Sequence, residues 1–407
     1  MRVVTVGTGM AAAEFVERLR LEGFEGEIVM MGDEDFPPYS PCVIPFFLAG
    51  EPLDTVFWKG RDFYDRYRVT ALLGDPVVEV DHVLRTVRTA GGRCESFDRL
   101  YFAPGAKNRV PRPEWLDTAG VFGFKTLSDM SDIGRYISEQ ACAFAVVYGG
   151  GFIGVDAALA LRQRGLSVTI VHRNTRLLSQ MTDEEGGHFA TRMLSEKSGL
   201  DIRLRTTVEG ISADGGRLKG VNLSDGTSLE TPLLIMAIGV EPNSRMLAFA
   251  DGGVECDVRM LADPCIYTAG DVAVTRHAVD GKPGIYANAP SAISQARIAA
   301  RHLVHGDGAY PGSLNSTVLR KHIDFPIISV GRFSGEALTW QRGDVWRRVY
   351  LQDGRINGYI VIGDTRMSGY LYQLYLSRKQ AGSELRELLA EGRHDGYYRG
   401  MLGITWG

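Results

Sequence analysis

Two short glycine-rich segments have the residue types and spacing of loops that bring the backbone close to a phosphate group. The first segment, GTGMAA, contains Gly7, Gly9, Met10, Ala11 and Ala12, and the second, GGGFIG, contains Gly149, Gly151, Phe152, Ile153 and Gly154. In this pattern the first glycine permits a tight turn, the second lets the backbone approach a pyrophosphate, and the third small residue lets helix pack on strand. We therefore expect both segments to bind dinucleotides at the N-terminus of the following helix.

The residues after the next predicted strand differ in charge between the two segments. Asp33 and Glu34 lie about 20 residues beyond the first loop, where a carboxylate accepts hydrogen bonds from ribose hydroxyls. After the second loop, this position holds His172, Arg173 and Arg176 and no carboxylate. Imidazole and guanidinium groups favour a 2′-phosphate, which slightly favours NADPH over NADH at the second site. The alternative is that the arginines are solvated charges at a strand end.

The thiol of Cys42 is a third candidate for chemistry, in the stretch PPYSPCVIPFFLAG at 37–50. Pro41 and Pro45 should hold this stretch out of regular helix and central strand. A thiol positioned in such a turn can react as a thiolate with a redox group or a sulfur substrate. The alternative is an inert, buried thiol that packs against Phe46 and Phe47.

The remaining cysteines are interpreted as packing residues in strands or hairpins; they are Cys94, Cys142, Cys256 and Cys265. No C-x-x-C pair and no metal-type spacing is present, so no zinc, iron–sulfur or other metal site is predicted. The odd number of cysteines, together with an N-terminus that lacks the features of a signal peptide, indicates free thiols and a cytoplasmic location.

Both glycine loops lie within a repeated order of predicted elements. Residues 2–31 and 144–171 each give a β-rich run, the glycine turn, a helical pattern and a second apolar strand, which is a βαβ unit. Short strands with glycine turns follow at 77–106 and 208–243. Each half is therefore predicted to be a Rossmann-like domain with a small antiparallel appendage.

The last third of the chain adds two more features. Residues 261–305 contain a further strand and a long helix from about Pro290 to His305. From about Thr317 the sequence changes to short strands, glycine turns and a helical tail. The predicted fold class is α/β, with two Rossmann-like dinucleotide-binding domains and a C-terminal α+β domain.

Two further phrases, AIGVEPN at 237–243 and TAGDVA at 268–273, complete a set of motifs. In this order, residues 1 to about 315 resemble the two-dinucleotide-binding flavoproteins of the pyridine nucleotide–disulfide oxidoreductase family. The resemblance implies that the first loop binds FAD and the second binds NAD(P)H. It also implies an FAD-binding domain at 1–112 and 241–316, an NAD(P)-binding domain at 113–240 and a C-terminal α+β interface domain at 317–407.

The same resemblance implies further contacts to FAD. Asp271, after Gly270, would bind the ribityl chain, and the phrase APGA departs at Pro104 from the usual ATGA. The other implied FAD residues are Ser40, Pro41, Ala103, Gly105, Ala289 and Pro290. The helix that begins at Ala289 and Pro290 would direct its N-terminal dipole toward the flavin pyrimidine ring. This dipole would stabilise negative charge on the ring when the flavin is reduced.

Two more residues are implied on the NAD(P) side. Gly239 belongs to the AIGVEPN phrase, and Asp156 occupies a position that the family commonly fills with a glutamate near the nicotinamide. The alternative for Asp156 is a carboxylate in the first helical turn that is stabilised by the helix dipole.

The resemblance supports two enzymatic hypotheses. Residues 343–366 resemble the C-terminal domain of rubredoxin-reductase and nitrite-reductase-type flavoproteins, which implies hydride exchange between NAD(P)H and FAD and electron transfer with an iron–sulfur protein or partner subunit. The spacing of Cys42 and Gly50 instead resembles single-cysteine coenzyme A disulfide reductases, NADH oxidases and NADH peroxidases. A third hypothesis is a structural or flavin-storage subunit without turnover.

Composition limits the partners. A net charge of −4 over 407 residues, without a run of like charge, gives no indication of binding to nucleic acid or anionic membranes. The most apolar stretch, 141–161, is interrupted by glycines and a charge, so no membrane span is predicted. A homodimer or a subunit of a larger complex is expected. The aromatic tail residues Tyr397, Tyr398 and Trp406 are candidates for docking a partner, or for self-packing or a dimer contact.

Overall fold

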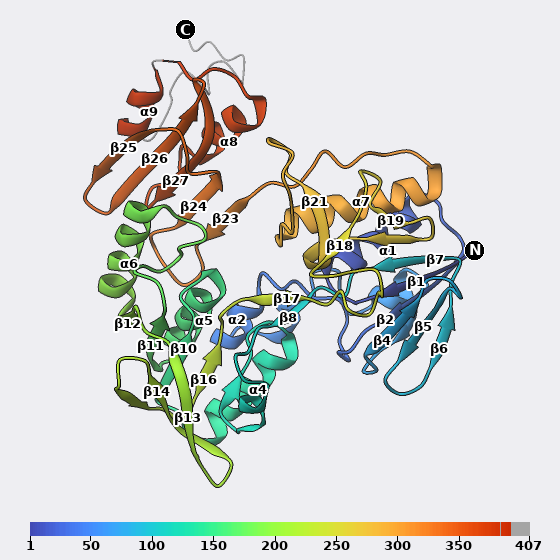
Figure 1. Ribbon diagram of the computed structural model, residues 1–407, viewed down its shortest axis with the longest axis horizontal. Coiled ribbons are helices and arrows are strands. Elements are labelled where there is room, and N and C mark those ends of the chain that lie inside the picture. Colours follow the sequence, from blue (N-terminus) through green and yellow to red (C-terminus); the bar gives the residue numbers. More distant parts are fainter. Residues whose placement is uncertain (383, 392–407) are drawn as a thin grey trace. The chain divides into compact units, whose positions relative to one another are not determined.

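The computed structural model describes residues 1–382 and 384–391 (Figure 1). The chain forms two compact units. The first unit contains Met1–Arg109, Lys125–Asp132 and Val240–Leu314, and the second contains Val110–Phe124, Ile133–Gly239 and the described residues from Asn315 onward. The assignment of the FAD, NAD(P) and interface domains to these residues stays a prediction.

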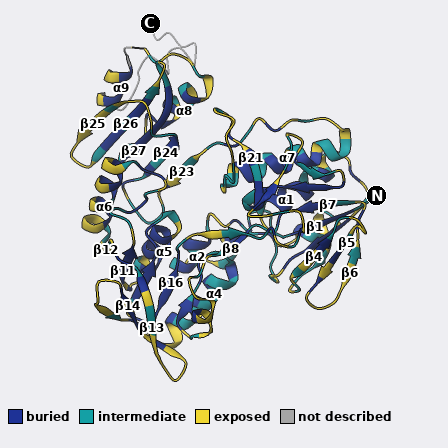
Figure 2. Cartoon of the chain, viewed as in Figure 1, coloured by how far each residue is buried: buried dark blue, intermediate teal, exposed yellow. Residues whose placement is uncertain are grey.

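A six-stranded sheet with the order β19-β20-β7-β1-β2-β3 forms the centre of the first unit. Its strands are β1 (Arg2–Val6), β2 (Glu27–Met31), β3 (Thr70–Leu72), β7 (Arg99–Phe102), β19 (Leu261–Asp263) and β20 (Ile266–Thr268). Neighbouring strands are parallel except for β19 and β20. The apolar runs of β1, β2 and β7 are buried almost throughout (Figure 2), as expected for parallel strands that are covered on both faces.

Two helices of the first unit, α1 (Met10–Leu21) and α7 (Ala289–His305), belong to one hydrophobic core. Ala12 and Ala13 of α1 and Ala296 of α7 are completely buried in it, because small side chains let two helices approach closely. The predicted helix from about Pro290 to His305 is thus present.

The other elements of the first unit are short. They are α2 (Ile44–Ala49), η1 (Leu53–Val56), α3 (Phe63–Arg66), β8 (Ala106–Asn108), β17 (Val240–Pro242), β18 (Val254–Glu255), η3 (Gly270–Val272), β21 (Ala273–Arg276) and β22 (Pro283–Gly284), with the antiparallel appendage β4 (Val77–Asp81), β5 (Thr86–Thr89) and β6 (Cys94–Ser96). One expectation was wrong, since Pro45 lies inside α2. Proline is tolerated in a first turn because the N–H that it lacks has no partner there.

A five-stranded parallel sheet with the order β12-β11-β10-β16-β9 forms the centre of the second unit. Its strands are β9 (Val121–Phe122), β10 (Phe144–Tyr148), β11 (Ser167–His172), β12 (Asp201–Leu204) and β16 (Leu234–Met236). The accompanying elements are η2 (Pro113–Asp117), α5 (Phe152–Gln163), α6 (Glu184–Ser198) and the antiparallel appendage β13 (Val208–Asp214), β14 (Arg217–Leu223) and β15 (Ser228–Glu230). Helix α4 (Leu127–Glu139) begins in the first unit and ends in the second.

The C-terminal part of the second unit is an antiparallel sheet with the order β23-β24-β27-β26-β25. The strands of this sheet are β23 (Ser316–Leu319), β24 (Ile327–Gly331), β25 (Glu336–Arg342), β26 (Val345–Gln352) and β27 (Arg355–Ile362). Two helices follow the last strand, α8 (Ser368–Ser377) and α9 (Glu384–Glu391). The sheet contacts α6 through Asp183, which caps that helix by accepting from Gly186 N (2.8 Å) and also accepts from Arg348 (2.5 Å) and the Tyr350 hydroxyl. The predicted α/β fold class is confirmed.

Two further expectations from the sequence concern the C-terminal tail and membrane-spanning helices. The predicted docking residues Tyr397, Tyr398 and Trp406 lie outside the described residues. Within the described residues, no helix combines the length and the apolarity that are needed to cross a membrane.

Candidate cofactor-binding sites

The first glycine loop, between β1 and α1, has the geometry of a phosphate-binding loop. Gly7 has φ +101°, and a Cβ there would lie 2.2 Å from the backbone oxygen of Ala103, so only glycine fits. Gly9 has φ −71°, and its Cβ would meet no atom within 4 Å. Gly9 caps α1 without a side-chain hydrogen bond, which leaves N–H groups of the first turn available to an anion. The other predicted loop residues are the half-buried Met10 and the buried Ala11 and Ala12.

The two acids after β2 have different roles. Glu34 accepts hydrogen bonds from the Tyr39 hydroxyl (2.6 Å) and from the backbone and hydroxyl of Ser128 (3.0 and 2.9 Å). Burial, and next the Glu34 carboxylate, raise the pKa of Tyr39 well above its usual value, so that tyrosine stays a donor. Asp33 is exposed and forms no hydrogen bond or ion pair with the described residues. Asp33 is therefore the better candidate for the ribose hydroxyls.

The AGD turn is held from two sides. Gly270 has φ +76° and donates its N–H to the buried side chain of Gln295 (2.8 Å). Asp271 is half-buried and forms an ion pair with Lys125 (Nζ to Oδ2, 3.0 Å). Asp129 accepts from the backbone N–H of Lys125 (2.8 Å) and thereby fixes the start of that segment. Sequence reasoning missed both Lys125 and Gln295.

The APGA turn keeps its geometry although Pro104 replaces the usual threonine. Gly105 has φ +66° and accepts from the backbone N–H of Asn243 (3.0 Å), whose side chain donates to the backbone oxygen of Pro104 (3.0 Å). Ala103 is buried, and its backbone oxygen lies against Gly7 of the first glycine loop. The AIGVEPN phrase therefore contributes to the first unit as a support for this turn.

Helix α7 begins at the predicted position, with Ala289 half-buried and Pro290 exposed. Asn288 caps it, because its side-chain oxygen accepts from Ser291 N (2.9 Å) while its amide donates to the backbone oxygen of Leu314 (3.0 Å). This cap fixes the N-terminal end of α7. The family resemblance implies that the dipole at this end points toward the flavin.

Cys42 lies in an exposed turn just before α2. The preceding Ser40 is buried and donates its N–H to Val56 (2.9 Å), whereas Pro41 is exposed. The alternative of a buried Cys42 was wrong, because the two prolines and the early start of α2 leave the thiol on the surface of the turn.

The other cysteines differ in exposure. Cys142 and Cys265 are buried, and Cys256 is half-buried, as expected for packing residues. Burial raises the pKa of Cys256 to about 12 and that of Cys265 to about 11, so neither forms a thiolate at neutral pH. Cys94 is exposed in the appendage sheet, so its interpretation as a packing residue was wrong; it lies on a short edge strand of that sheet.

The second glycine loop repeats the geometry of the first. Gly149 has φ +124°, and a Cβ there would lie 2.1 Å from the backbone oxygen of Ala237. A Cβ on Gly154 would lie 1.8 Å from the oxygen of Gly149. Gly151 caps α5 without a side-chain bond, and its Cβ would meet no atom within 4 Å. The next residues, Phe152 and Ile153, are half-buried and exposed. This loop also fits a pyrophosphate.

The residues at the end of β11 and just after it are less uniformly basic than the sequence suggested. His172 is buried, its Nδ1 accepts from Gly150 N (3.0 Å), and burial lowers its pKa to about 4. At neutral pH it is an uncharged support for the loop rather than a cation. Arg176 donates to the backbone oxygen of Asp183 (3.0 Å), whereas Arg173 is exposed. Arg173 is thus the better candidate for a 2′-phosphate.

Asp156 is buried on α5 and pairs with Lys321 from the loop between β23 and β24. Burial raises its pKa, and Lys321 opposes that rise. Because α5 begins at Phe152, the interpretation of Asp156 as a first-turn acid was wrong. Gly239 is exposed with φ +120°.

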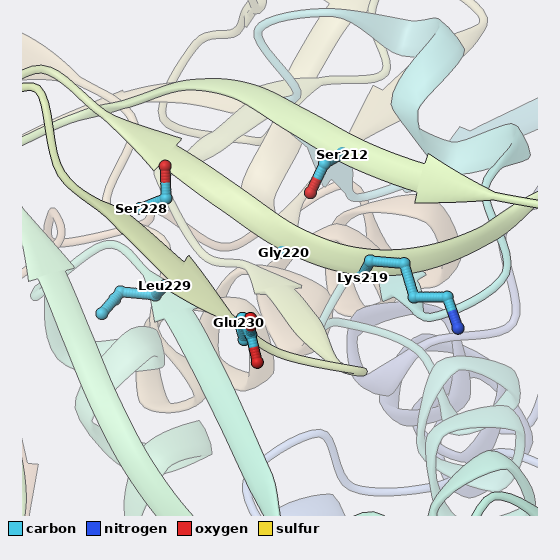
Figure 3. Close-up of a pocket in the computed structure, with 6 residues that line it drawn as sticks. All are labelled: Ser212, Lys219, Gly220, Ser228, Leu229 and Glu230. Carbon is cyan, nitrogen blue, oxygen red and sulfur yellow. The ribbon is translucent and has the colours of Figure 1, made fainter.

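A shallow hollow on the appendage of the second unit is unrelated to these residues (Figure 3). It is lined by Ser212, Lys219, Gly220, Ser228, Leu229 and Glu230, from β13, β14 and β15. None of the predicted cofactor residues lines it.

Residues 1–296 match the sequence model of a family described as pyridine nucleotide-disulphide oxidoreductase. The chain belongs to this family. The predicted class, an oxidoreductase that uses FAD and NAD(P)H, is confirmed at the level of the family. Both glycine loops leave the backbone open to the close approach that these dinucleotides need. The individual contacts to FAD and NAD(P)H stay predictions.

The names of two relatives of the chain describe electron transfer in one case and the reduction of coenzyme A polysulfide or persulfide in the other. It is 26% identical over 402 residues to the assimilatory nitrate reductase electron transfer subunit of Bacillus subtilis, covering 95% of this chain and 51% of that protein. It is 28% identical over 350 residues to an NAD(P)H coenzyme A polysulfide/persulfide reductase of Pyrococcus horikoshii, covering 83% and 77%. The solved covalent putidaredoxin reductase–putidaredoxin complex matches with a TM-score of 0.86 and 25% identity, covering 96% and 98%. The chain thus spans about half the length of the nitrate reductase subunit.

Proposed function

We propose that the chain is a cytoplasmic FAD-dependent NAD(P)H:acceptor oxidoreductase that exchanges electrons with an iron–sulfur protein or a partner subunit. The observation that carries this proposal is the pair of glycine loops, each with an open second glycine at a helix N-terminus that has no side-chain cap. The names of the nitrate reductase electron transfer subunit and of the putidaredoxin complex support a protein acceptor.

The residues of each unit have separate tasks in this proposal. In the first unit, Gly9 and the N-terminus of α1 would bind the pyrophosphate of FAD, Asp33 its ribose, and Asp271 with Lys125 the ribityl chain. In the second unit, Gly151 and α5 would bind NAD(P)H. Bound FAD would supply the conversion between two-electron hydride chemistry and single-electron transfer.

A second candidate function is a thiol-dependent reductase that uses Cys42. The exposure of Cys42 in its turn favours it, because a reacting thiolate must reach its substrate. The name of the persulfide reductase relative supports the same candidate. The two candidates differ in whether turnover requires this thiol.

We expect Cys42→Ser to retain turnover with an iron–sulfur protein or a dye acceptor, within about twofold of the unmodified protein, because no step of the proposed function uses the thiol. Steady-state NAD(P)H oxidation measures this. Cys94→Ser is the matched control, since Cys94 is also exposed but lies on the appendage sheet. A loss of turnover in Cys42→Ser alone, for protein and dye acceptors as well as for coenzyme A disulfide, would favour the thiol-dependent reductase.

A further inference from the structure

Ser313 is a completely buried serine that joins polar side chains from separate parts of the first unit. Its hydroxyl lies 2.9 Å from the hydroxyl of Thr275 on β21 and 2.8 Å from that of Tyr310. The side-chain amide of Gln295 on α7 donates to it at 3.4 Å. All three partners are buried as well. Buried polar groups need partners inside the protein, so these four residues form one network, which we call the Ser313 network.

The backbone around Ser313 is attached to β21 and the residues just after it. Ser313 donates its N–H to the backbone oxygen of Arg276, and its own oxygen accepts from the N–H of Ala278, both at 2.8 Å. The preceding Gly312 has φ +109°, and a Cβ there would lie 2.7 Å from the Cα of Ala278, so only glycine fits. The backbone therefore sets the position of the Ser313 hydroxyl without help from its side-chain partners.

The Ser313 network determines which way the amide of Gln295 points. The backbone N–H of Gly270 can only donate, so the Gln295 oxygen faces it, at 2.8 Å. The NH₂ group of the amide then faces Ser313, whose hydroxyl must accept. A serine hydroxyl accepts twice and donates once, which leaves one acceptance and one donation for Thr275 and Tyr310. Ser313 thus holds the amide in the orientation that Gly270 requires.

Gly270 connects this network to the AGD turn. It begins η3 with φ +76° and directly precedes Asp271. If the Gln295 amide rotated, its NH₂ group would face the N–H of Gly270, and two donors would oppose each other. A buried donor without an acceptor is costly, so the turn would shift to recover a partner. The orientation of Gln295 therefore decides how firmly the turn holds Asp271.

We propose that Ser313 is a positioning residue for the flavin part of FAD: it orients Gln295, which fixes the turn that carries Asp271. The proposal rests on the proposed function, because it assumes that Asp271 binds the ribityl chain. Ser313 lies outside the residues that match the family model, 1–296. The residues proposed for the pyrophosphate and the adenosine ribose, Gly9 and Asp33, take part in none of these bonds. A defect at Ser313 should therefore affect the flavin part of the ligand alone.

The test compares FAD with ADP on the cofactor-depleted protein by isothermal titration calorimetry. ADP carries the adenosine and two phosphates but lacks the ribityl chain and the flavin, and neither ligand requires turnover. We expect Ser313→Ala to weaken FAD binding about tenfold and to leave ADP binding within about twofold. Gln295→Leu should cause a selective loss at least as large, because it removes the acceptor for Gly270 at a similar side-chain size.

Thr89→Val is the control for the loss of a buried hydroxyl. Thr89 is a buried residue of the same unit, and its hydroxyl donates to Asp75 at 2.6 Å beside the antiparallel appendage. This variant should change neither affinity. A general loss of stability would weaken both ligands, whereas the proposed role of Ser313 lowers the affinity for FAD alone.

A double-mutant cycle tests whether Ser313 acts through Gln295. In a Gln295→Leu background, Ser313→Ala should cause no further loss of FAD affinity, because the amide that it orients is already absent. Equal loss of FAD and ADP affinity, no loss of either, or a further loss in that background would overturn the role of Ser313. If the unmodified protein binds neither ligand, the proposed function itself fails.

Discussion

Gly151→Ala is expected to leave FAD bound but to raise the KM for NAD(P)H at least about 100-fold, equivalent to about 2.8 kcal/mol. The added methyl group meets no atom of the chain within 4 Å, and the φ of −78° suits alanine, so the protein itself tolerates the change. Only a ligand that approaches the backbone at this point meets the methyl group. Flavin absorbance after purification and the rate of flavin reduction by NAD(P)H measure the two parts of the prediction.

Gly149→Ala provides the contrast. Its Cβ would lie 2.1 Å from the backbone oxygen of Ala237, and φ is +124°, so the loop itself must distort. This variant should lose thermal stability, whereas Gly151→Ala should not. If Gly151→Ala is reduced by NAD(P)H as readily as the unmodified protein, the second glycine loop does not bind the pyrophosphate.

Asp271→Ala is expected to purify with little FAD. The carboxylate accepts from Lys125 and lies on a turn that Gln295 holds. Its removal takes away the proposed acceptor for the ribityl hydroxyls and leaves the ammonium of Lys125 without this partner. Hydrogen bonds to charged groups contribute about 1.5–3 kcal/mol each, so FAD affinity should fall about 10- to 100-fold. FAD titration of the cofactor-depleted protein measures the affinity.

Asp54→Ala serves as the control for Asp271→Ala. Asp54 also pairs with a cation of the first unit, Arg61, but both side chains are exposed, and exposed pairs contribute little. It should retain the FAD content of the unmodified protein. An unchanged FAD affinity in Asp271→Ala would remove that residue from the site.

The sequence alone predicted both glycine loops, because the conformation of each loop depends on neighbouring residues of one βαβ unit. The turn at Gly7 and the helix start at Gly9 follow from the spacing of small residues in one βαβ unit. The same reasoning should have allowed Pro45 in a helix, since the first turn accepts proline. The repeated βαβ units likewise predicted a mainly parallel sheet in each half, because the helix of such a unit connects two parallel strands.

Contacts between distant residues could not be read from those patterns. Lys125 and Asp271 are separated by 146 residues, and Lys321 and Asp156 by 165. Whether an ionisable side chain faces a ligand or supports a loop depends on such packing. His172 is uncharged because the fold buries it against the second loop, although its position in the sequence suggested a cation.

Anaerobic mixing of the FAD-loaded protein with NADH, and separately with NADPH, tests the central claim most directly. The proposed function predicts that at least one of the two nucleotides abolishes the visible absorbance of the oxidised flavin, and that an iron–sulfur protein or a dye then restores it. A protein that retains FAD but whose absorbance neither nucleotide changes would contradict the claim and favour a subunit without turnover.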